Sequence, residues 1–194
     1  MGSYEFKCDP CIDAWDKCWV EGATPWDIGH VTPILSQLIQ KDLVPQGRTL
    51  VPGCGAGYDV MALANHNRYV VGVDISETAI KRAQELAAGA PNAEYFQFLK
   101  EDFFTWAPAE PFDFIFDYMF FCAIEPQMRS AWAKHVAELI KPNGELLTLM
   151  FPVGNHEGGP PYAVSVPQYE KVLHPFGFEA ISIENNEMSI GLRK

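Results

Sequence analysis

The feature that most constrains the fold is an alternation of short apolar runs with helical stretches. The apolar runs are rich in residues that favour strands and cover 48–51, 69–73, 94–98, 112–116 and 145–150. Helical stretches lie between several of them, near 57–66, 76–89 and 127–141. Continuous apolar strands separated by helices form a parallel sheet that is covered on both faces. The sequence therefore predicts an α/β fold.

Two further helices are predicted before the first strand, over 9–19 and 31–42. Residues 1–47 are therefore interpreted as an N-terminal helical lid segment, and residues 48–194 as the core of the protein. A length of 194 residues is typical of one domain and allows a sizeable core to be buried. We expect one structural domain overall.

The C-terminal part follows a different pattern. A helix near 166–174 precedes two β-rich runs, 179–183 and 187–192, which are separated by Asn185-Asn186. A short polar turn between two such runs predicts a β-hairpin. We therefore expect the parallel sheet to end in an antiparallel pair of strands.

The charge of the chain excludes several classes of partner. Fourteen Lys and Arg against 25 Asp and Glu give a formal net charge of −11 at pH 7. Such a surface repels phosphate backbones and anionic lipids, which argues against nucleic-acid and membrane partners. No apolar run approaches the ~20 residues that span a bilayer, and no signal pattern opens the chain. We expect a cytoplasmic protein, with a monomer as the default.

The cysteines do not indicate a metal site. Cys8 and Cys11 have the spacing of half a zinc site, but no second pair and no histidine follows at ligand distance. Five cysteines are also an odd number, spread through apolar surroundings, unlike the disulfide framework of a secreted domain. We expect no bound metal.

A glycine-rich loop follows the first predicted strand, with the sequence Leu50-Val51-Pro52-Gly53-Cys54-Gly55-Ala56-Gly57. Glycines at this point let the backbone turn tightly and approach a ligand. The second strand ends about 20 residues later in Asp74, the spacing at which a carboxylate accepts hydrogen bonds from ribose hydroxyls. Together, the loop and Asp74 indicate a cofactor that contains adenosine, either NAD or S-adenosylmethionine.

Three observations favour S-adenosylmethionine. The last glycine of the dinucleotide fingerprint is missing, because Asp59 follows Tyr58. The first strand begins only after about 47 residues with two helices. The third strand is followed by Asp102-Phe103, a pair suited to accept from an adenine amino group and to pack on its ring. An acidic turn beside a core phenylalanine explains that pair equally well. An NAD-dependent dehydrogenase is the disfavoured alternative.

Several motifs together resemble the thiopurine-methyltransferase-like class I methyltransferases. In chain order they are Trp15 and Trp19 four residues apart, Thr24-Pro25-Trp26-Asp27, Val51-Pro52-Gly53-Cys54-Gly55, Val73-Asp74, Asp102-Phe103, Asp117-Tyr118 and Ala123-Ile124-Glu125-Pro126. Within this group the chain is most similar to the plant halide/thiol methyltransferases. The resemblance implies a Rossmann-like three-layer α/β/α sandwich with seven strands in the order 3-2-1-4-5-7-6, of which strand 7 is antiparallel.

The resemblance also implies a site, residue by residue. Its cofactor-binding residues are Trp15, Trp19 and Trp26, Gly53, Cys54 and Gly55 at the methionine end, Asp74 and Ile75 at the ribose, Asp102 and Phe103 at the adenine, and Asp117 and Tyr118 beside the sulfonium. Asp117, Tyr118, Phe151 and Tyr162 are its expected pocket and positioning residues. Indole faces attract cations by ~0.5–2 kcal/mol, which suits a positively charged sulfur.

The acceptor is predicted from what the sequence lacks. The five histidines are scattered among different elements, and none forms a convincing general base, His156 being the best of a weak set. Halide ions, thiocyanate and hydrosulfide carry no proton that a base must remove, and direct displacement on a methyl group needs mainly orientation. We therefore expect methyl transfer to such anions or to small thiols. The alternatives are a thiopurine-type or general small-molecule S-methyltransferase and a cofactor-binding domain without turnover.

Overall fold

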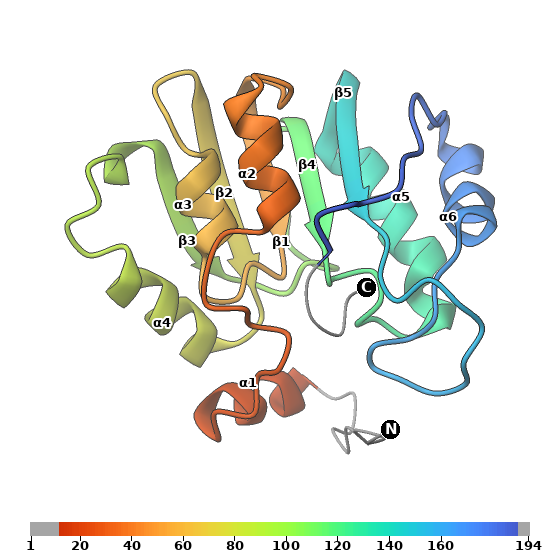
Figure 1. Cartoon of the computed structure of the whole chain (residues 1–194), viewed down its shortest axis with the longest axis horizontal. Coiled ribbons are helices and arrows are strands. Elements are labelled where there is room, and N and C mark those ends of the chain that lie inside the picture. The colour runs from red at the N-terminus through yellow and green to blue at the C-terminus, as the bar shows by residue number, and fades with distance from the viewer. Residues whose placement is uncertain (1–11, 190–194) are drawn as a thin grey trace.

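The core of the protein is a sheet of five strands in the order β3-β2-β1-β4-β5, in which all neighbouring strands run parallel (Figure 1). The computed structural model describes residues 12–189. Its strands are β1 (Gly47–Pro52), β2 (Arg68–Asp74), β3 (Phe96–Lys100), β4 (Phe112–Tyr118) and β5 (Ile140–Leu149). The predicted α/β class, the parallel pairing and the order 3-2-1-4-5 are thereby confirmed.

The central strands are buried on both faces, which explains their continuous apolar sequences. Leu50 of β1 lies opposite Val71 of β2 and Ile115 of β4, and all three side chains are fully buried. Parallel strands covered by helices on both sides have no solvent-facing positions for polar residues. The edge strand β5 differs, because none of its side chains is fully covered.

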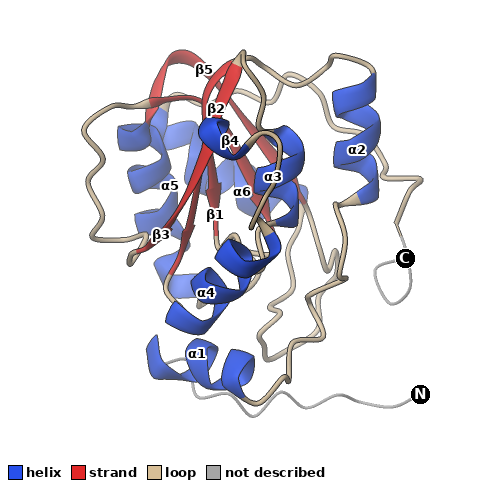
Figure 2. Cartoon of the chain, turned by 90° about the vertical axis from the view of Figure 1, so that its left-hand side faces the viewer, coloured by secondary structure: helices blue, strands red, loops and turns tan. Residues whose placement is uncertain are grey.

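Helices cover both faces of the sheet and make three layers (Figure 2). One layer contains α2 (Pro33–Gln40), α3 (Tyr58–Leu63) and α4 (Glu77–Leu86), and the other contains α5 (Arg129–Leu139) and α6 (Val166–Leu173). Leu35 of α2 and Val60 of α3 are fully buried in one core cluster, whereas Trp132 of α5 and Tyr169 of α6 belong to the other. Short 3-10 turns lie at Ala93–Tyr95, Pro126–Met128 and His174–Phe176.

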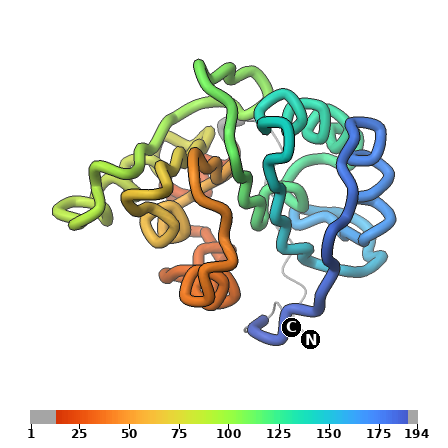
Figure 3. Tube along the Cα trace, turned by 90° about the horizontal axis from the view of Figure 1, so that it is seen from above, coloured from red at the N-terminus to blue at the C-terminus, as the bar shows by residue number. Residues whose placement is uncertain are grey.

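The chain builds one side of the molecule before the other. From β1 it moves outward to β3, then crosses back to β4 and moves outward again to β5, so the two halves lie side by side when seen from above (Figure 3). The carboxyl ends of β1 and β4 are adjacent where this direction reverses, which is where open α/β sheets bind ligands. Helix α1 (Ile12–Val20) lies beneath this end of the sheet (Figure 1).

The predicted seven-stranded sheet is wrong for the described part of the chain. Residues 179–183 form no strand, and the other half of the predicted hairpin extends past residue 189, outside the described residues. Ile181 is 89% exposed and Ile183 is 55% exposed, so neither side chain rests on the core. A two-stranded hairpin without a third strand or a covering helix is only marginally stable in water. Two β-rich runs with a polar turn between them are therefore not enough to predict a strand at residues 179–183.

Two smaller findings complete the fold. The third strand begins at Phe96 rather than at residue 94, because Ala93–Tyr95 turns and the Asn92 side chain donates to the carbonyls of Met61 (2.8 Å) and Ala64 (2.9 Å).

Among the described residues, no helix is long and apolar enough to cross a membrane.

We predict that Gly57→Ala destabilises the fold more than Gly89→Ala. Both glycines have left-handed backbones, with φ of +78° and +80°, which costs other residues about 1–2 kcal/mol. A Cβ at Gly57 would lie 2.5 Å from the Phe98 ring, whereas nothing lies within 4 Å of a Cβ at Gly89. Urea unfolding should show about 1–3 kcal/mol of additional loss for Gly57→Ala, the usual cost of overpacking. Equal losses would contradict this close approach.

Candidate active site

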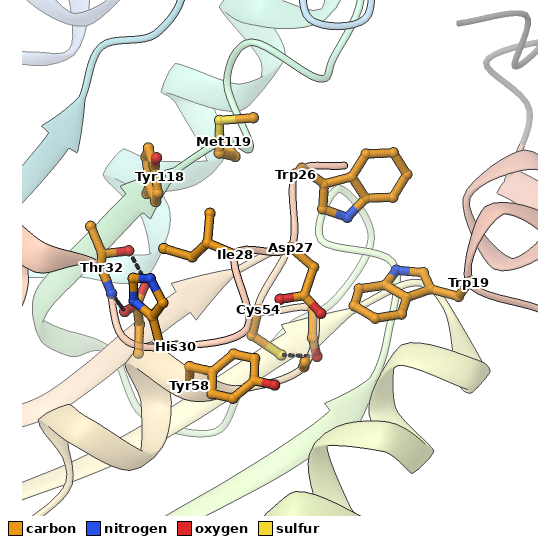
Figure 4. A pocket seen from close by; sticks show the side chains of 14 residues that line it. Trp19, Trp26, Asp27, Ile28, His30, Thr32, Cys54, Tyr58, Tyr118 and Met119 are labelled. Carbon is orange, nitrogen blue, oxygen red and sulfur yellow. Dashed lines mark hydrogen bonds between the residues drawn. The ribbon is translucent and has the colours of Figure 1, made fainter. Parts of the chain in front are cut away.

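A cleft lies where the chain reverses direction between β1 and β4. Its lining residues are Trp19, Trp26, Asp27, Ile28, His30, Thr32, Gly53, Cys54, Gly55, Ala56, Tyr58, Asp59, Tyr118 and Met119 (Figure 4). The space is about 480 Å³ when the open solvent at its mouth is included. Three separate segments meet here: the end of α1 with the stretch that leads to α2, the glycine loop after β1 with the start of α3, and the end of β4 with the turn that follows it.

The glycine loop allows aromatic rings to approach its backbone. Gly53 and Gly55 have φ of +60° and +51°, in the left-handed region that favours glycine. A Cβ at Gly53 would lie 2.6 Å from Cδ2 of Phe120, and a Cβ at Gly55 would lie 3.1 Å from Cζ2 of Trp19. A side chain at either position would therefore crowd the ring that packs against it. The loop fits a ligand that contacts bare backbone.

Asp74 lies at the end of β2, directly beside this loop. Its Oδ2 accepts a hydrogen bond from the backbone N–H of Gly55 (2.9 Å), and its Oδ1 accepts one from Ser76 (2.9 Å). Burial raises the pKa of this carboxyl, and the two backbone hydrogen bonds oppose that effect. A carboxylate has about four lone-pair positions, so Asp74 can still accept from ribose hydroxyls. Asp74 is not itself among the residues that line the cleft, and its role at a ribose stays a prediction.

The three predicted tryptophans lie together. Trp26 packs edge to face against Trp15 and Trp19, with ring centroids 5.3 Å and 6.4 Å apart. Trp19 and Trp26 line the cleft, whereas Trp15 supports Trp26 from outside the lining. The spacing of four residues on α1 therefore places two indoles against the third as the sequence indicated.

Helix α1 is held in place by a carboxylate. Oδ1 of Asp16 accepts hydrogen bonds from the Ser76 hydroxyl (2.7 Å) and from the backbone N–H of Thr78 (2.8 Å) at the start of α4. The hydrogen bonds from Thr78 and Ser76 lower the pKa of Asp16. Because Ser76 also contacts Asp74, the tryptophan helix is linked to the glycine loop through two carboxylates.

Cys54 lines the cleft but is a poor nucleophile. Burial raises the pKa of its thiol well above the ordinary value, and the nearby Asp74 carboxylate raises it further. The thiolate is the reactive form of cysteine, so a thiol that stays protonated is inert. Its side chain also contacts Gly72 of β2, where a Cβ would lie 3.0 Å from Sγ. Cys54 therefore shapes the cleft without competing for a reactive ligand.

Asp117 lies beneath the cleft rather than in it. It is 1% exposed and accepts hydrogen bonds from the Phe121 N–H (3.2 Å) and from Nε1 of Trp132 (3.0 Å). Burial raises the pKa of this carboxyl to about 7, although these hydrogen bonds oppose the shift. The bonds hold the turn that carries Tyr118 and Met119 into the cleft, and Met119 has a left-handed φ of +66°. Asp117 is thus placed to position its neighbours.

The remaining predicted residues lie outside the cleft lining. Oδ1 of Asp102 accepts from the Phe104 N–H (3.0 Å) in a tight turn, and Phe103 is 3% exposed, with its ring 5.0 Å from that of Phe120. Phe103 is therefore a core residue, which is the second of the two interpretations of Asp102-Phe103 that the sequence leaves open. The half-buried residues Ile75, Phe151 and Tyr162 follow Asp74 and β5, and the Tyr162 N–H donates to the Cys122 carbonyl (2.7 Å).

The sequence did not single out Asp27, Ile28, His30, Thr32, Ala56, Tyr58, Asp59 or Met119 as site residues. Both carboxylate oxygens of Asp59 accept from Thr32, from its N–H and from its hydroxyl, at 2.8 Å each. The only signal for this contact was an acidic residue in the place of a fingerprint glycine. His156 is the histidine that the sequence favours as a general base. It lies in an exposed loop with its ring bonded to the Pro161 carbonyl, whereas His30 lines the cleft.

Cys8 and Cys11 precede residue 12 and lie outside the described residues. Between residues 12 and 189, no group of three His, Cys, Asp or Glu side chains is placed to hold a metal ion.

We predict that Asp16→Ala loosens α1. Loss of a helix-capping carboxylate costs about 0.5–2 kcal/mol, and Glu21→Ala, which removes only an exposed pair with Lys17, should cost far less. Since the pKa of Asp16 is lowered on folding, its contribution is present above about pH 4 and is lost as the pH falls through the folded-state pKa. Hydrogen exchange of the α1 amides measures the effect. Equal exchange in the two variants would contradict it.

We predict an opposite pH effect for Asp117→Asn. Because the pKa of Asp117 is raised on folding, the folded state keeps a proton that the unfolded chain releases, so this group destabilises the fold increasingly between about pH 4 and pH 7. The free energy of unfolding of the variant, relative to the native chain, should therefore rise across this range and level off above it. Urea unfolding at several pH values measures the difference. A flat difference would show that Asp117 ionises normally.

The chain was compared with known proteins. It matches the thiopurine S-methyltransferase family over residues 11–190. It is 59% identical over 180 residues to "Probable thiol methyltransferase 2" of Arabidopsis thaliana, covering 93% of this chain and 80% of that protein. It is 58% identical over 180 residues to "Thiocyanate methyltransferase 1" of Brassica oleracea, with the same two coverages.

A solved structure has the same fold. Magnesium protoporphyrin IX methyltransferase from Synechocystis PCC 6803, with bound S-adenosylmethionine, aligns with a TM-score of 0.61 at 18% identity, covering 92% of this chain and 76% of that one. At this identity the likeness shows the fold alone. The family match and the plant relatives go further: the chain belongs to the thiopurine S-methyltransferase family and is an S-adenosylmethionine-dependent methyltransferase.

Proposed function

We propose that this enzyme methylates thiocyanate, hydrosulfide and other small thiols, and halide ions. The observation that carries the proposal is the cleft itself, in which a bare glycine loop faces indole rings and no Lys or Arg is among the described lining residues. The printed names of the two plant relatives, a thiol and a thiocyanate methyltransferase, support the same acceptor class.

The chemistry asks little of the protein beyond placement. When bound, S-adenosylmethionine supplies a methyl group on a positively charged sulfur, and a nucleophile displaces that sulfur, which keeps the bonding electrons. The chain orients the two reactants and excludes water, effects that together contribute up to ~7–11 kcal/mol. An acceptor that arrives as an anion needs no general base. This agrees with a cleft in which Asp59 is engaged by Thr32 and Cys54 stays protonated.

The proposed cofactor contacts follow the cleft. Trp19 and Trp26, supported by Trp15, face the sulfonium, and Gly53, Cys54 and Gly55 form the backbone cradle for the methionine end. Geometry supports these contacts, because two indoles line the cleft beside a loop whose Gly53 and Gly55 leave no room for a side chain.

The nucleoside is assigned to the ends of β2 and β3. Asp74 accepts from the ribose, Ile75 covers that end, and Asp102 accepts from the adenine amino group. Phe103 supports the site from the core, because its ring packs on Phe120, which in turn lies beside Gly53.

The acceptor pocket is assigned to the side of the cleft that follows β4 and β5. Tyr118 lines the cleft, and Asp117 positions it through the turn that it holds. Phe151 and Tyr162 are proposed to complete the apolar wall. The hydrogen bond from the Tyr162 N–H to Cys122 supports this, since it joins the loop after β5 to the turn after β4.

The N-terminal segment is proposed to act as a lid. Within residues 1–47, Leu35 of α2 is fully buried in the core and Asp16 ties α1 to the start of α4, so we expect movement in residues 21–32 between these two helices. We further propose that the enzyme is a cytoplasmic monomer. A net charge of −11 opposes self-association and supports the monomer, which size-exclusion chromatography with light scattering tests.

We predict that the purified enzyme with S-adenosylmethionine forms methyl thiocyanate, methanethiol and methyl iodide from thiocyanate, hydrosulfide and iodide. Headspace gas chromatography detects the volatile products, and S-adenosylhomocysteine is quantified in the same samples. A thiopurine should be a poorer acceptor, because it is larger and brings no charge of its own to the cleft. A thiopurine preferred over all three anions would contradict the proposal, as would tight cofactor binding without any methylated product.

A further inference from the structure

His30 lines the cleft, and a hydrogen bond identifies which of its ring nitrogens carries the proton in the neutral ring. Its Nδ1 is 2.7 Å from the backbone carbonyl of Val31. A carbonyl only accepts hydrogen bonds, so Nδ1 carries a proton. Nε2 therefore carries a proton only when the ring is a positively charged imidazolium. His30 is exposed and lines the cleft.

Asp27 lies three residues before His30 and lines the same cleft. Its Oδ1 accepts a hydrogen bond from the Gly29 N–H (2.9 Å), whereas its Oδ2 has no hydrogen-bond donor within residues 12–189. Figure 4 shows the two cleft tryptophans on one side, His30 on the other, and the Asp27 carboxylate between them. The cleft thus has an aromatic end, then a negative group, then a basic group.

The other titratable groups of the cleft do not repeat this pattern. Asp59 on α3 is engaged by both donors of Thr32, and Cys54 on the loop after β1 keeps its proton because burial raises its pKa. Tyr58 on α3 and Tyr118 at the end of β4 are the remaining titratable side chains in the lining. His30 is therefore the single basic group in the described lining.

We propose that Asp27 and His30 together bind the amino-acid end of the cofactor, with the ammonium group on Asp27 and the carboxylate on Nε2 of His30. The inference rests on the proposed position of the methionine end at the tryptophans and the glycine loop. The ammonium and the carboxylate leave the same α carbon, so a zwitterion requires one group of each sign in the cleft, and this pair supplies both. An adenine or ribose requires neither charge.

The tautomer makes this contact sensitive to pH. Nε2 donates to a carboxylate only as part of the imidazolium, so binding of the amino-acid end favours protonated His30. A lower pH favours the charged form of an imidazole, so affinity for a ligand with this carboxylate increases as the pH falls. A ligand without the amino acid gains nothing from the protonation.

Calorimetric binding of S-adenosylhomocysteine and of 5′-methylthioadenosine, which lacks the amino acid, tests the proposal at pH 6 and pH 8. S-adenosylhomocysteine should bind the native chain about fivefold more tightly at pH 6, the effect of an exposed ion pair of about 1 kcal/mol. His30→Gln should abolish this dependence, and His30→Arg should bind tightly at both pH values, because guanidinium keeps its charge. Asp27→Asn should weaken S-adenosylhomocysteine alone, and His66→Gln, an exposed histidine outside the cleft, should match the native chain.

Two results would overturn the proposal. One is an unchanged pH dependence of S-adenosylhomocysteine binding in His30→Gln. The other is an equal weakening of both ligands in the His30 and Asp27 variants, which would mean that these residues only support the loop. Because binding is measured directly, failure of methyl transfer to every acceptor would count against the proposed acceptors and not against this pair.

Discussion

The Asp74 carboxylate is the contact on which the geometry of the cleft depends. One of its oxygens holds the glycine loop through Gly55, and the other holds the start of α4 through Ser76. The Ser76 hydroxyl continues this connection to Asp16 on α1, which carries two of the three clustered tryptophans. Loop, ribose residue and aromatic wall are therefore fixed relative to one another by three short hydrogen bonds to two carboxylates. A change at any of these contacts is expected to alter the whole cleft.

Carboxylates dominate this region, yet little of their charge is directed at an acceptor. Asp59 is engaged by Thr32, Asp16 by the start of α4, and Asp117 is buried with a pKa of about 7 beneath the turn. These groups hold the backbone and leave aromatic and bare peptide surfaces toward the ligand. An overall charge of −11 is thus compatible with an anionic acceptor, because the cofactor brings the local positive charge.

Much of this arrangement could be predicted from local sequence. Continuous apolar strands predicted the parallel α/β sheet, and the spacing after the glycine loop predicted Asp74 at the end of β2, because burial and strand ends leave direct patterns in the residues. The strand order came from the family resemblance. Contacts between distant segments could not be predicted in this way. The pairing of Thr32 with Asp59 joins residues 27 apart, and the orientation of His30 depends on a single carbonyl. The hairpin failed for a related reason, since alternation in 179–183 does not say whether the core covers those side chains.

The central claim is that the cleft between β1 and β4 holds the methyl donor with its amino-acid end at the glycine loop. A crystal structure of the complex with S-adenosylhomocysteine tests this most directly. We expect its sulfur beside Trp19 and Trp26, its amino acid along Gly53 to Gly55, and its ribose on Asp74. A ligand bound elsewhere, or in this cleft with its adenine against the tryptophans, would contradict the assignment.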